Sequence, residues 1–325
     1  MRKHFPSSHL ECPLSVSVNP HLTMVKEGAL RWVQHFQLFT QEDILHRLDL
    51  AAPWDLSARV YPHLSSEKLQ VITDWLVWAV IYDALWCDEI EGNARHVERL
   101  VSLQHRLIDV LKEGWTDHSG HISGGESLRW ENSLIEAWRN IIGRLREVIP
   151  NAELYWFTQS FDQYFQATMW EVMQTLNHTT PEQSLYVKLR PFSGGGYAFL
   201  EFRHLLEGVS SLDIRKNVFV RQLEAMANNH VLWSNDIFSY PKEVARGATS
   251  NLVWIVQEKS RLSIDQAIQH VVSMCNAEMR AYSDLRALLP ELGKIDSITA
   301  AYLSFLDDYV GGHLDWVYKA THRYD

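Results

Sequence analysis

The 325 residues carry a formal net charge of -10 and are 46% hydrophobic and 22% charged. This composition is typical of a folded chain with a sizeable core and excludes disorder over most of its length. The acidic balance argues against nucleic acid as the main partner, because phosphate backbones bind basic faces. A small phosphorylated ligand is not excluded, since binding it needs only a few positively charged side chains near one another.

The three cysteines, Cys12, Cys87 and Cys275, are too few and too far apart for a disulfide framework or a zinc site. The N-terminal segment lacks the apolar run of a signal peptide, and no stretch reaches the ~18 apolar residues of a membrane span. We therefore expect a soluble cytoplasmic protein with no membrane partner.

Glycine and proline are scarce and most segments follow the helical period, which predicts an all-α fold. A helix begins near Ser65 and runs without glycine or proline to Gly92. The segment from Arg190 to Gly196 interrupts a helical region. The other predicted helices cover 126–148, 151–176, about 213–243, a stretch from 263, and a stretch from about 298. Ser263 and Gln266 are spaced as a capping box that would open the helix from 263. The sequence predicts one domain over 1–325, of which about 1–25 could be flexible.

A polar stripe marks the predicted helix at 213–243. Asn235, Ser239 and Glu243 are spaced i, i+4, i+8, so their side chains share one face. Amide, hydroxyl and carboxylate oxygens form a hard donor set that suits Mg²⁺. Lys242 lies on nearly the same face and could meet phosphate charge. A solvated polar surface is the alternative interpretation.

Two aspartates, Asp83 and Asp88, lie towards the C-terminal end of the predicted helix that starts near Ser65 and has an aromatic face. Asp83 directly follows the apolar face, where a carboxylate is costly unless it is paired or bound to metal. The alternative is an Asp at the edge of that face, reaching solvent or an Arg. In a regular α-helix Asp88 would lie ~140° away from Asp83. That geometry makes Asp83 the direct metal ligand and leaves Asp88 to act through a water or an Arg.

Together these features resemble the class I terpene synthases, specifically the single-domain microbial terpene cyclases. The string Asn-Asp-x-x-Ser-x-x-Lys-Glu, which starts at Asn235, matches the second metal motif of that family. The stretch from Asp83 to Asp88 resembles the aspartate-rich first motif. It departs from the family at Ala84, where a second aspartate is usual.

The resemblance also implies roles for residues outside the two metal motifs. Arg190 matches the diphosphate-sensing arginine, and Ser193 and Gly194 match the linker and effector positions at a helix break. Arg323 and Tyr324 match the C-terminal pair that hydrogen-bonds diphosphate, to which Lys242 would contribute.

The implied fold is the terpenoid synthase helical bundle with a central active-site cavity. The small and medium side chains of Leu76, Ala79 and Val80 would line that cavity and leave it roomy. The implied activity is that of a carbon–oxygen lyase acting on phosphates. It would ionise a prenyl diphosphate, farnesyl diphosphate being favoured, and cyclise the cation. The implied cofactor is Mg²⁺, as three ions, with Mn²⁺ able to substitute. The protein would be a monomer or a homodimer.

Three alternatives remain open at this stage. The first is a diterpene cyclase acting on geranylgeranyl diphosphate. The second is a chain-elongating prenyltransferase, but it would need two aspartate-rich motifs and the second motif here is of the Asn/Ser/Glu kind. The third is a catalytically silent helical protein that binds prenyl diphosphate, which Ala84 alone supports.

Overall fold

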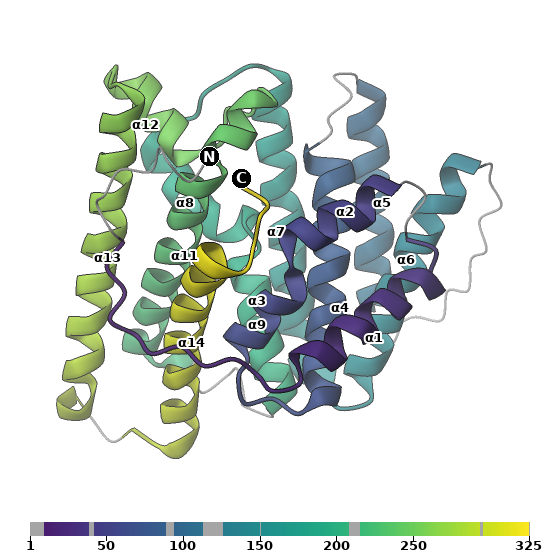
Figure 1. Cartoon of the computed structure of the whole chain (residues 1–325), viewed down its shortest axis with the longest axis horizontal. Helices are drawn as coiled ribbons and strands as arrows, with labels where there is room; N and C mark the ends of the chain where they lie inside the picture. The colour runs from purple at the N-terminus through teal and green to yellow at the C-terminus, as the bar shows by residue number, and fades with distance from the viewer. Residues whose placement is uncertain are drawn as a thin grey trace.

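The computed structural model describes residues 10–38, 42–88, 94–112, 126–149, 151–207, 215–292 and 295–324. These ranges contain helices and no strand, so the predicted all-α fold is confirmed. The helices pack side by side as a bundle (Figure 1). In chain order they are α1 (Leu22–His35), α2 (Glu42–Ala51), α3 (Pro53–Val60), α4 (Ser66–Tyr82), η2 (Asp83–Asp88), α5 (Ala94–Lys112), α6 (Glu126–Arg146), α7 (Asn151–Leu176), α8 (Gln183–Ser193), α9 (Gly196–Glu207), α11 (Val218–Ala245), α12 (Leu252–Ser260), α13 (Ile264–Leu292) and α14 (Ser297–Lys319).

Side-chain caps set several of the helix starts. The Asn217 side chain accepts hydrogen bonds from the backbone N–H groups of Phe219 and Val220 at the start of α11. Before α13, Ser263 and Gln266 exchange hydrogen bonds as the predicted capping box requires. Such caps satisfy backbone donors that the first turn of a helix leaves unpaired.

The helix that carries Asp83 changes its winding at that residue. α4 ends at Tyr82, and residues 83–88 form the π-helical turn η2. A π-helix joins residues i and i+5 by hydrogen bonds and has about 4.4 residues per turn, so positions five apart lie roughly 50° from one another around the helix axis. The expectation of a regular helix here was wrong. The argument that separated Asp83 from Asp88 by ~140° therefore does not apply to this turn.

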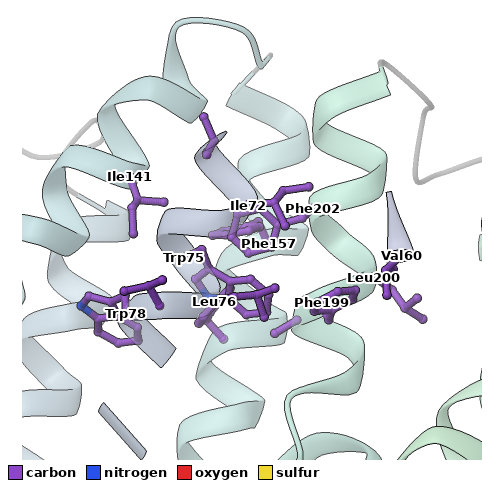
Figure 2. Packing of buried hydrophobic residues seen from close by; sticks show 14 of the residues in the cluster. Val60, Ile72, Trp75, Leu76, Trp78, Ile141, Phe157, Phe199, Leu200 and Phe202 are labelled. Atoms are coloured by element: carbon purple, nitrogen blue, oxygen red, sulfur yellow. The ribbon is translucent and has the colours of Figure 1, made fainter. Parts of the chain in front are cut away.

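An aromatic core fills the bundle around α4, α6, α7 and α9. Figure 2 shows Trp75, Trp78, Phe157 and Phe202 packed with aliphatic neighbours. The indole N–H of Trp78 donates to the Leu134 carbonyl at 2.9 Å, so burying the ring leaves no unpaired donor. A second cluster, around Trp233, Ile255 and Val271, holds α11, α12 and α13 together.

The N-terminal segment is described from Leu10 onward, and there it packs against the bundle. It crosses α13 and α14 before α1 begins (Figure 1). Glu11 pairs with Arg280 of α13 at 2.8 Å, and its backbone N–H donates to Asn276 at 2.8 Å. Residues 1–9 lie outside the described part of the chain. No helix in the described ranges is long and apolar enough to cross a bilayer.

Close packing of α14 on α3 depends on one glycine. A Cβ atom at Gly312 would lie 2.6 Å from the backbone oxygen of Arg59, which cannot move aside as a side chain could. We predict that Gly312→Ala lowers the free energy of unfolding by about 1–3 kcal/mol, the usual cost of overpacking. Gly143→Ala is the matched control, because a Cβ at that exposed position of α6 meets nothing within 4 Å.

The control variant should gain roughly 0.5–1 kcal/mol, since alanine is the better helix former. Urea denaturation of the three proteins measures both changes. Equal stability of Gly312→Ala and the parent chain would contradict the packing of α14 on α3 described above.

Candidate active site

A cavity of about 300 Å³ lies between α4, α7, α8, α9, α11 and α14. Nearly all the residues singled out from the sequence line it, although they come from segments far apart in the chain. They are Leu76, Ala79, Val80, Asp83, Arg190, Ser193, Gly194, Asn235, Ser239, Lys242, Glu243, Arg323 and Tyr324. The side chain of Asp88 lies outside the described residues.

Aromatic rings cover much of the inner wall. Trp75 packs on Phe199 at 5.4 Å and on Phe161 at 6.2 Å, and Phe199 stacks on Tyr309 at 5.3 Å. These bulky rings line the cavity beside Leu76, Ala79 and Val80. The wall thus combines these large rings with the three smaller side chains that the sequence singled out, and the volume of about 300 Å³ lies within the range of ligand sites.

The polar stripe of α11 faces this cavity rather than solvent. Asn235, Ser239 and Glu243 all contribute to its wall. The Ser239 hydroxyl is buried and acts to lower the pKa of the neighbouring Glu243 carboxyl group. Glu243 accepts a hydrogen bond from Asn251 at 2.9 Å. Burial raises the pKa of Glu243, and the nearby Asp236 raises it further, so this carboxyl group favours a cation in its vicinity.

Arg190 is the centre of a buried polar network. One terminal nitrogen, Nη2, lies 2.7 Å from the Asp236 carboxylate and donates to the Asn235 side-chain oxygen at 3.2 Å. The other, Nη1, lies 3.8 Å from Glu171. Burial opposes the charge on Arg190, but Asp236 and the other acids around it outweigh that cost and raise its pKa. The guanidinium is therefore charged and held in place by α11 and α7.

Asp236 was part of the sequence motif, yet no separate role was assigned to it. It is fully buried and accepts hydrogen bonds from the Tyr186 hydroxyl at 2.8 Å and the Leu252 N–H at 3.0 Å. Tyr186 lies one helical turn before Arg190 on α8. These contacts hold Asp236 in place, so that it positions Arg190. In the sequence, the only hint of this network was the i, i+4 spacing of Tyr186 and Arg190.

Glu171 was missed by the sequence reasoning. It lines the cavity from α7 and accepts a hydrogen bond from the Ser193 hydroxyl at 2.5 Å. Burial raises its pKa to about 7, although Arg190 and Ser193 both act to lower it. Glu171 thus links the arginine to the helix break that follows it. In the sequence, the only hint of its role was an acidic residue directly after Trp170 in a helix rich in aromatic residues.

The break between α8 and α9 follows from its glycines. Gly195 has φ +70°, a conformation that glycine adopts without strain. A Cβ at Gly194 would meet Leu232 at 2.5 Å, and one at Gly196 would meet Asn228 at 2.3 Å. Small residues therefore let this turn approach α11 closely, with Ser193 and Gly194 at the cavity wall.

The C-terminal segment returns over the bundle and reaches the cavity. The backbone N–H of His322 donates to the Leu50 carbonyl at 2.8 Å, which anchors the segment on α2. Arg323 pairs with Asp83 at 2.9 Å, and the Tyr324 hydroxyl accepts a hydrogen bond from Asn235 at 2.7 Å. Asp83 therefore contacts an arginine, which was one of the two interpretations of this residue in the sequence. Burial raises the pKa of Tyr324 to about 12, so its hydroxyl is protonated.

Comparison with known proteins assigns the family. Residues 74–281 match the family model described as terpene synthase family 2, C-terminal metal binding. The match covers more than half of the chain and includes the second half of α4 and all of α8 and α11. The chain belongs to this family. The prediction of a microbial terpene cyclase is confirmed, and the metal-binding description supports a divalent metal cofactor.

Curated relatives share this assignment along nearly their whole length. The terpene synthase described here is 28% identical over 316 residues to a (+)-T-muurolol synthase from Roseiflexus castenholzii, with 97% of this chain and 93% of that protein covered. It is 26% identical over 320 residues to a germacrene A synthase from Nostoc punctiforme, covering 97% and 94%. A sesquiterpene synthase from Postia placenta is 30% identical over 315 residues, covering 95% and 86%.

Solved structures with this fold are also terpene synthases. An α-eudesmol synthase superposes with a TM-score of 0.81 at 18% identity, covering 96% of this chain and 99% of that one. A linalool/nerolidol synthase from Streptomyces clavuligerus gives a TM-score of 0.81 at 18% identity, covering 95% and 100%. At this identity the likeness establishes the terpenoid synthase fold and nothing finer.

Proposed function

We propose that this terpene synthase is a Mg²⁺-dependent sesquiterpene cyclase that ionises farnesyl diphosphate and cyclises the resulting cation. The observation that supports it most is one cavity whose wall combines an oxygen-donor stripe, two arginines, and aromatic and aliphatic side chains. Its relative from Roseiflexus castenholzii is described as cyclising (2E,6E)-farnesyl diphosphate. The product would be a hydrocarbon or an alcohol, released together with diphosphate.

The donors on α11 suit a hard cation. Asn235, Ser239 and Glu243 offer oxygen atoms as metal ligands, and all three line the cavity. Asp83, which lines the same cavity, would add a carboxylate, and Asp88 as a further metal ligand belongs to the same proposal. Bound Mg²⁺ would supply a Lewis acid that neutralises negative charge on the leaving diphosphate. Three ions, and Mn²⁺ as a substitute, belong to the same proposal.

Basic groups near these donors would bind the diphosphate. Arg190 is held rigidly by Asp236, so its planar fork can grip phosphate oxygens without first being ordered. Lys242 and Arg323 add positive charge at the cavity wall, and Tyr324 adds a hydroxyl donor. Since Arg323 is paired with Asp83, a diphosphate would compete with that carboxylate for the guanidinium.

The helix break would place backbone dipoles near the carbon that ionises. Ser193 and Gly194 lie at the cavity wall, directly after Arg190 on the chain. The hydrogen bond from Ser193 to Glu171, and the contact of Glu171 with Arg190, tie this turn to the diphosphate-binding arginine. Binding of the leaving group and orientation of the turn would therefore be mechanically linked.

The aromatic wall would protect the cation. Ring faces carry negative charge density that attracts a cation, and a closed apolar surface keeps water away from it. The farnesyl diphosphate substrate named for the relative from Roseiflexus castenholzii favours a C15 chain over a C20 chain. Geranylgeranyl diphosphate, chain elongation and silent binding are the alternatives that the following experiment separates.

We predict that the purified protein with Mg²⁺ converts farnesyl diphosphate to a cyclic product, detected by gas chromatography–mass spectrometry, in preference to the C10 and C20 diphosphates. Glu243→Gln should lower turnover at least about 100-fold, because it removes a metal-binding charge. Glu258→Gln, at an exposed position of α12, is the matched control and should behave as the parent chain.

Thermal midpoints should stay close to one another in the three proteins, which separates a lost site from a lost fold. Full turnover by Glu243→Gln would contradict the α11 metal site. A product larger than the substrate would indicate chain elongation, and C20 cyclisation alone would indicate a diterpene cyclase.

The π-helical turn yields a separate prediction about the two aspartates. Since positions five apart lie only roughly 50° from one another in η2, on the same side of the helix, Asp83→Asn and Asp88→Asn should both lower turnover at least about 100-fold and raise the Mg²⁺ requirement. Asp109→Asn on the exposed face of α5 is the control. A Mg²⁺ titration of turnover measures the effect. Near-normal titration of Asp88→Asn would show that only Asp83 binds the ion, as a regular helix would require.

A further inference from the structure

Asn251, the residue directly before α12, uses all of its hydrogen-bonding capacity behind the cavity wall. It is 0% exposed and is not among the residues that line the cavity. Its two side-chain N–H groups donate to the Asp236 carbonyl and to Glu243 Oε2, at 2.9 Å each. Its side-chain oxygen accepts the backbone N–H groups of Val253 and Trp254 at 2.9 and 3.3 Å. An asparagine amide offers two donors and two acceptor sites, so none is left over.

The accepting half of this amide has an ordinary structural role. Asn251 is the N-cap of α12, and its oxygen satisfies two backbone donors in the first turn. Serine, threonine or aspartate at this position would provide the same cap. The cap therefore does not account for the two N–H groups, both of which donate to α11.

The donating half joins the two sides of an interruption in α11. Pro241 lies inside this helix and has no backbone N–H, so the helix lacks the hydrogen bond that would reach the Ile237 carbonyl. Asp236 lies before Pro241 and Glu243 lies after it. By donating to both, Asn251 connects the helix across the turn in which its own ladder is incomplete.

That turn also separates the three oxygen donors of the polar stripe. Asn235 and Ser239 precede Pro241, and Glu243 follows it, and all three donors line the cavity. They can bind one cation only while both sides of the turn keep a fixed spacing. Glu243 also has a long side chain, and ordering it on binding costs entropy. The bond from Asn251 holds one carboxylate oxygen and so fixes the direction in which the other faces.

We propose that Asn251 is a positioning residue for the metal site of α11, which rests on the proposed function above. Its amide bridges the turn at Pro241 and holds the Glu243 carboxylate in the orientation that binds the cation. Asn251 touches neither metal nor substrate and acts through Glu243 and the backbone of Asp236. Removing a group that holds a metal ligand typically weakens metal binding about 10- to 100-fold.

Two substitutions separate the donors from the cap. Asn251→Ser keeps a capping oxygen but lacks the nitrogen that reaches Glu243, and Asn251→Ala loses both functions. Both variants should bind Mn²⁺ at least about tenfold more weakly in the presence of inorganic diphosphate, because neither holds the carboxylate. Electron paramagnetic resonance of free Mn²⁺, with diphosphate alone as the blank, measures this affinity without turnover.

Stability should respond differently from metal binding. The thermal midpoint should fall further in Asn251→Ala than in Asn251→Ser, because only alanine removes the cap. Saturating Mg²⁺ should restore most of the turnover of Asn251→Ser, since its metal ligands remain. A merely structural role would instead make the loss of Mn²⁺ affinity follow the loss of stability, with serine close to the parent chain.

Asn217→Ser is the matched control. Asn217 caps α11 in the same way, by accepting the N–H groups of Phe219 and Val220, but it is exposed and lies at the end of the helix far from the polar stripe. This variant should bind Mn²⁺ as the parent chain does. An equal loss of affinity in Asn217→Ser would overturn the inference, because any weakened cap would then loosen the site.

Parent-like Mn²⁺ affinity in either Asn251 variant would overturn the inference alone. A parent protein that binds no Mn²⁺ beyond the diphosphate blank would contradict the proposed metal site, and the inference with it. If both variants fail to fold, a crystal structure of the parent protein with Mn²⁺ and inorganic diphosphate decides. Glu243 should then bind the ion with its hydrogen bond from Asn251 intact, and a bound ion with that bond broken would overturn the inference.

Discussion

The active site is organised around one buried ion pair, between Arg190 of α8 and Asp236 of α11. Both side chains are removed from water, and an uncompensated charge there would cost on the order of 3–5 kcal/mol. The two helices must therefore keep a fixed separation and register. Tyr186 and the N–H of Leu252 complete the hydrogen bonds of the aspartate, so α8, α11 and α12 act as one frame.

Two features of that frame prepare it for an anionic ligand. Arg190 is charged and oriented before anything binds, and the metal motif lies on the same helix as its carboxylate partner. The helix break after Ser193 exists because Gly194 and Gly196 allow close approach to Leu232 and Asn228. Ionisation would then take place between a rigid polar wall and an aromatic wall, so few protein groups would have to move during the reaction.

Sequence reasoning was sufficient wherever spacing within one helix carried the information. The i, i+4, i+8 stripe on α11 and the capping box at Ser263 are of that kind. It was not sufficient where long-range packing decides. The π-helical winding of η2 depends on which backbone groups pair in hydrogen bonds, and no residue pattern predicted it. Glu171 contacts Ser193 only because α7 packs on α8. Likewise, Asn251 contacts Glu243 only because the start of α12 lies against α11.

The most direct test of the account is a crystal structure of the protein with Mg²⁺ and inorganic diphosphate. The account predicts a metal ion bound by Asn235, Ser239 and Glu243, and a diphosphate that contacts Arg190 while the Arg190–Asp236 pair stays intact. A diphosphate bound away from Arg190, or metal ions that leave the α11 stripe unoccupied, would contradict it.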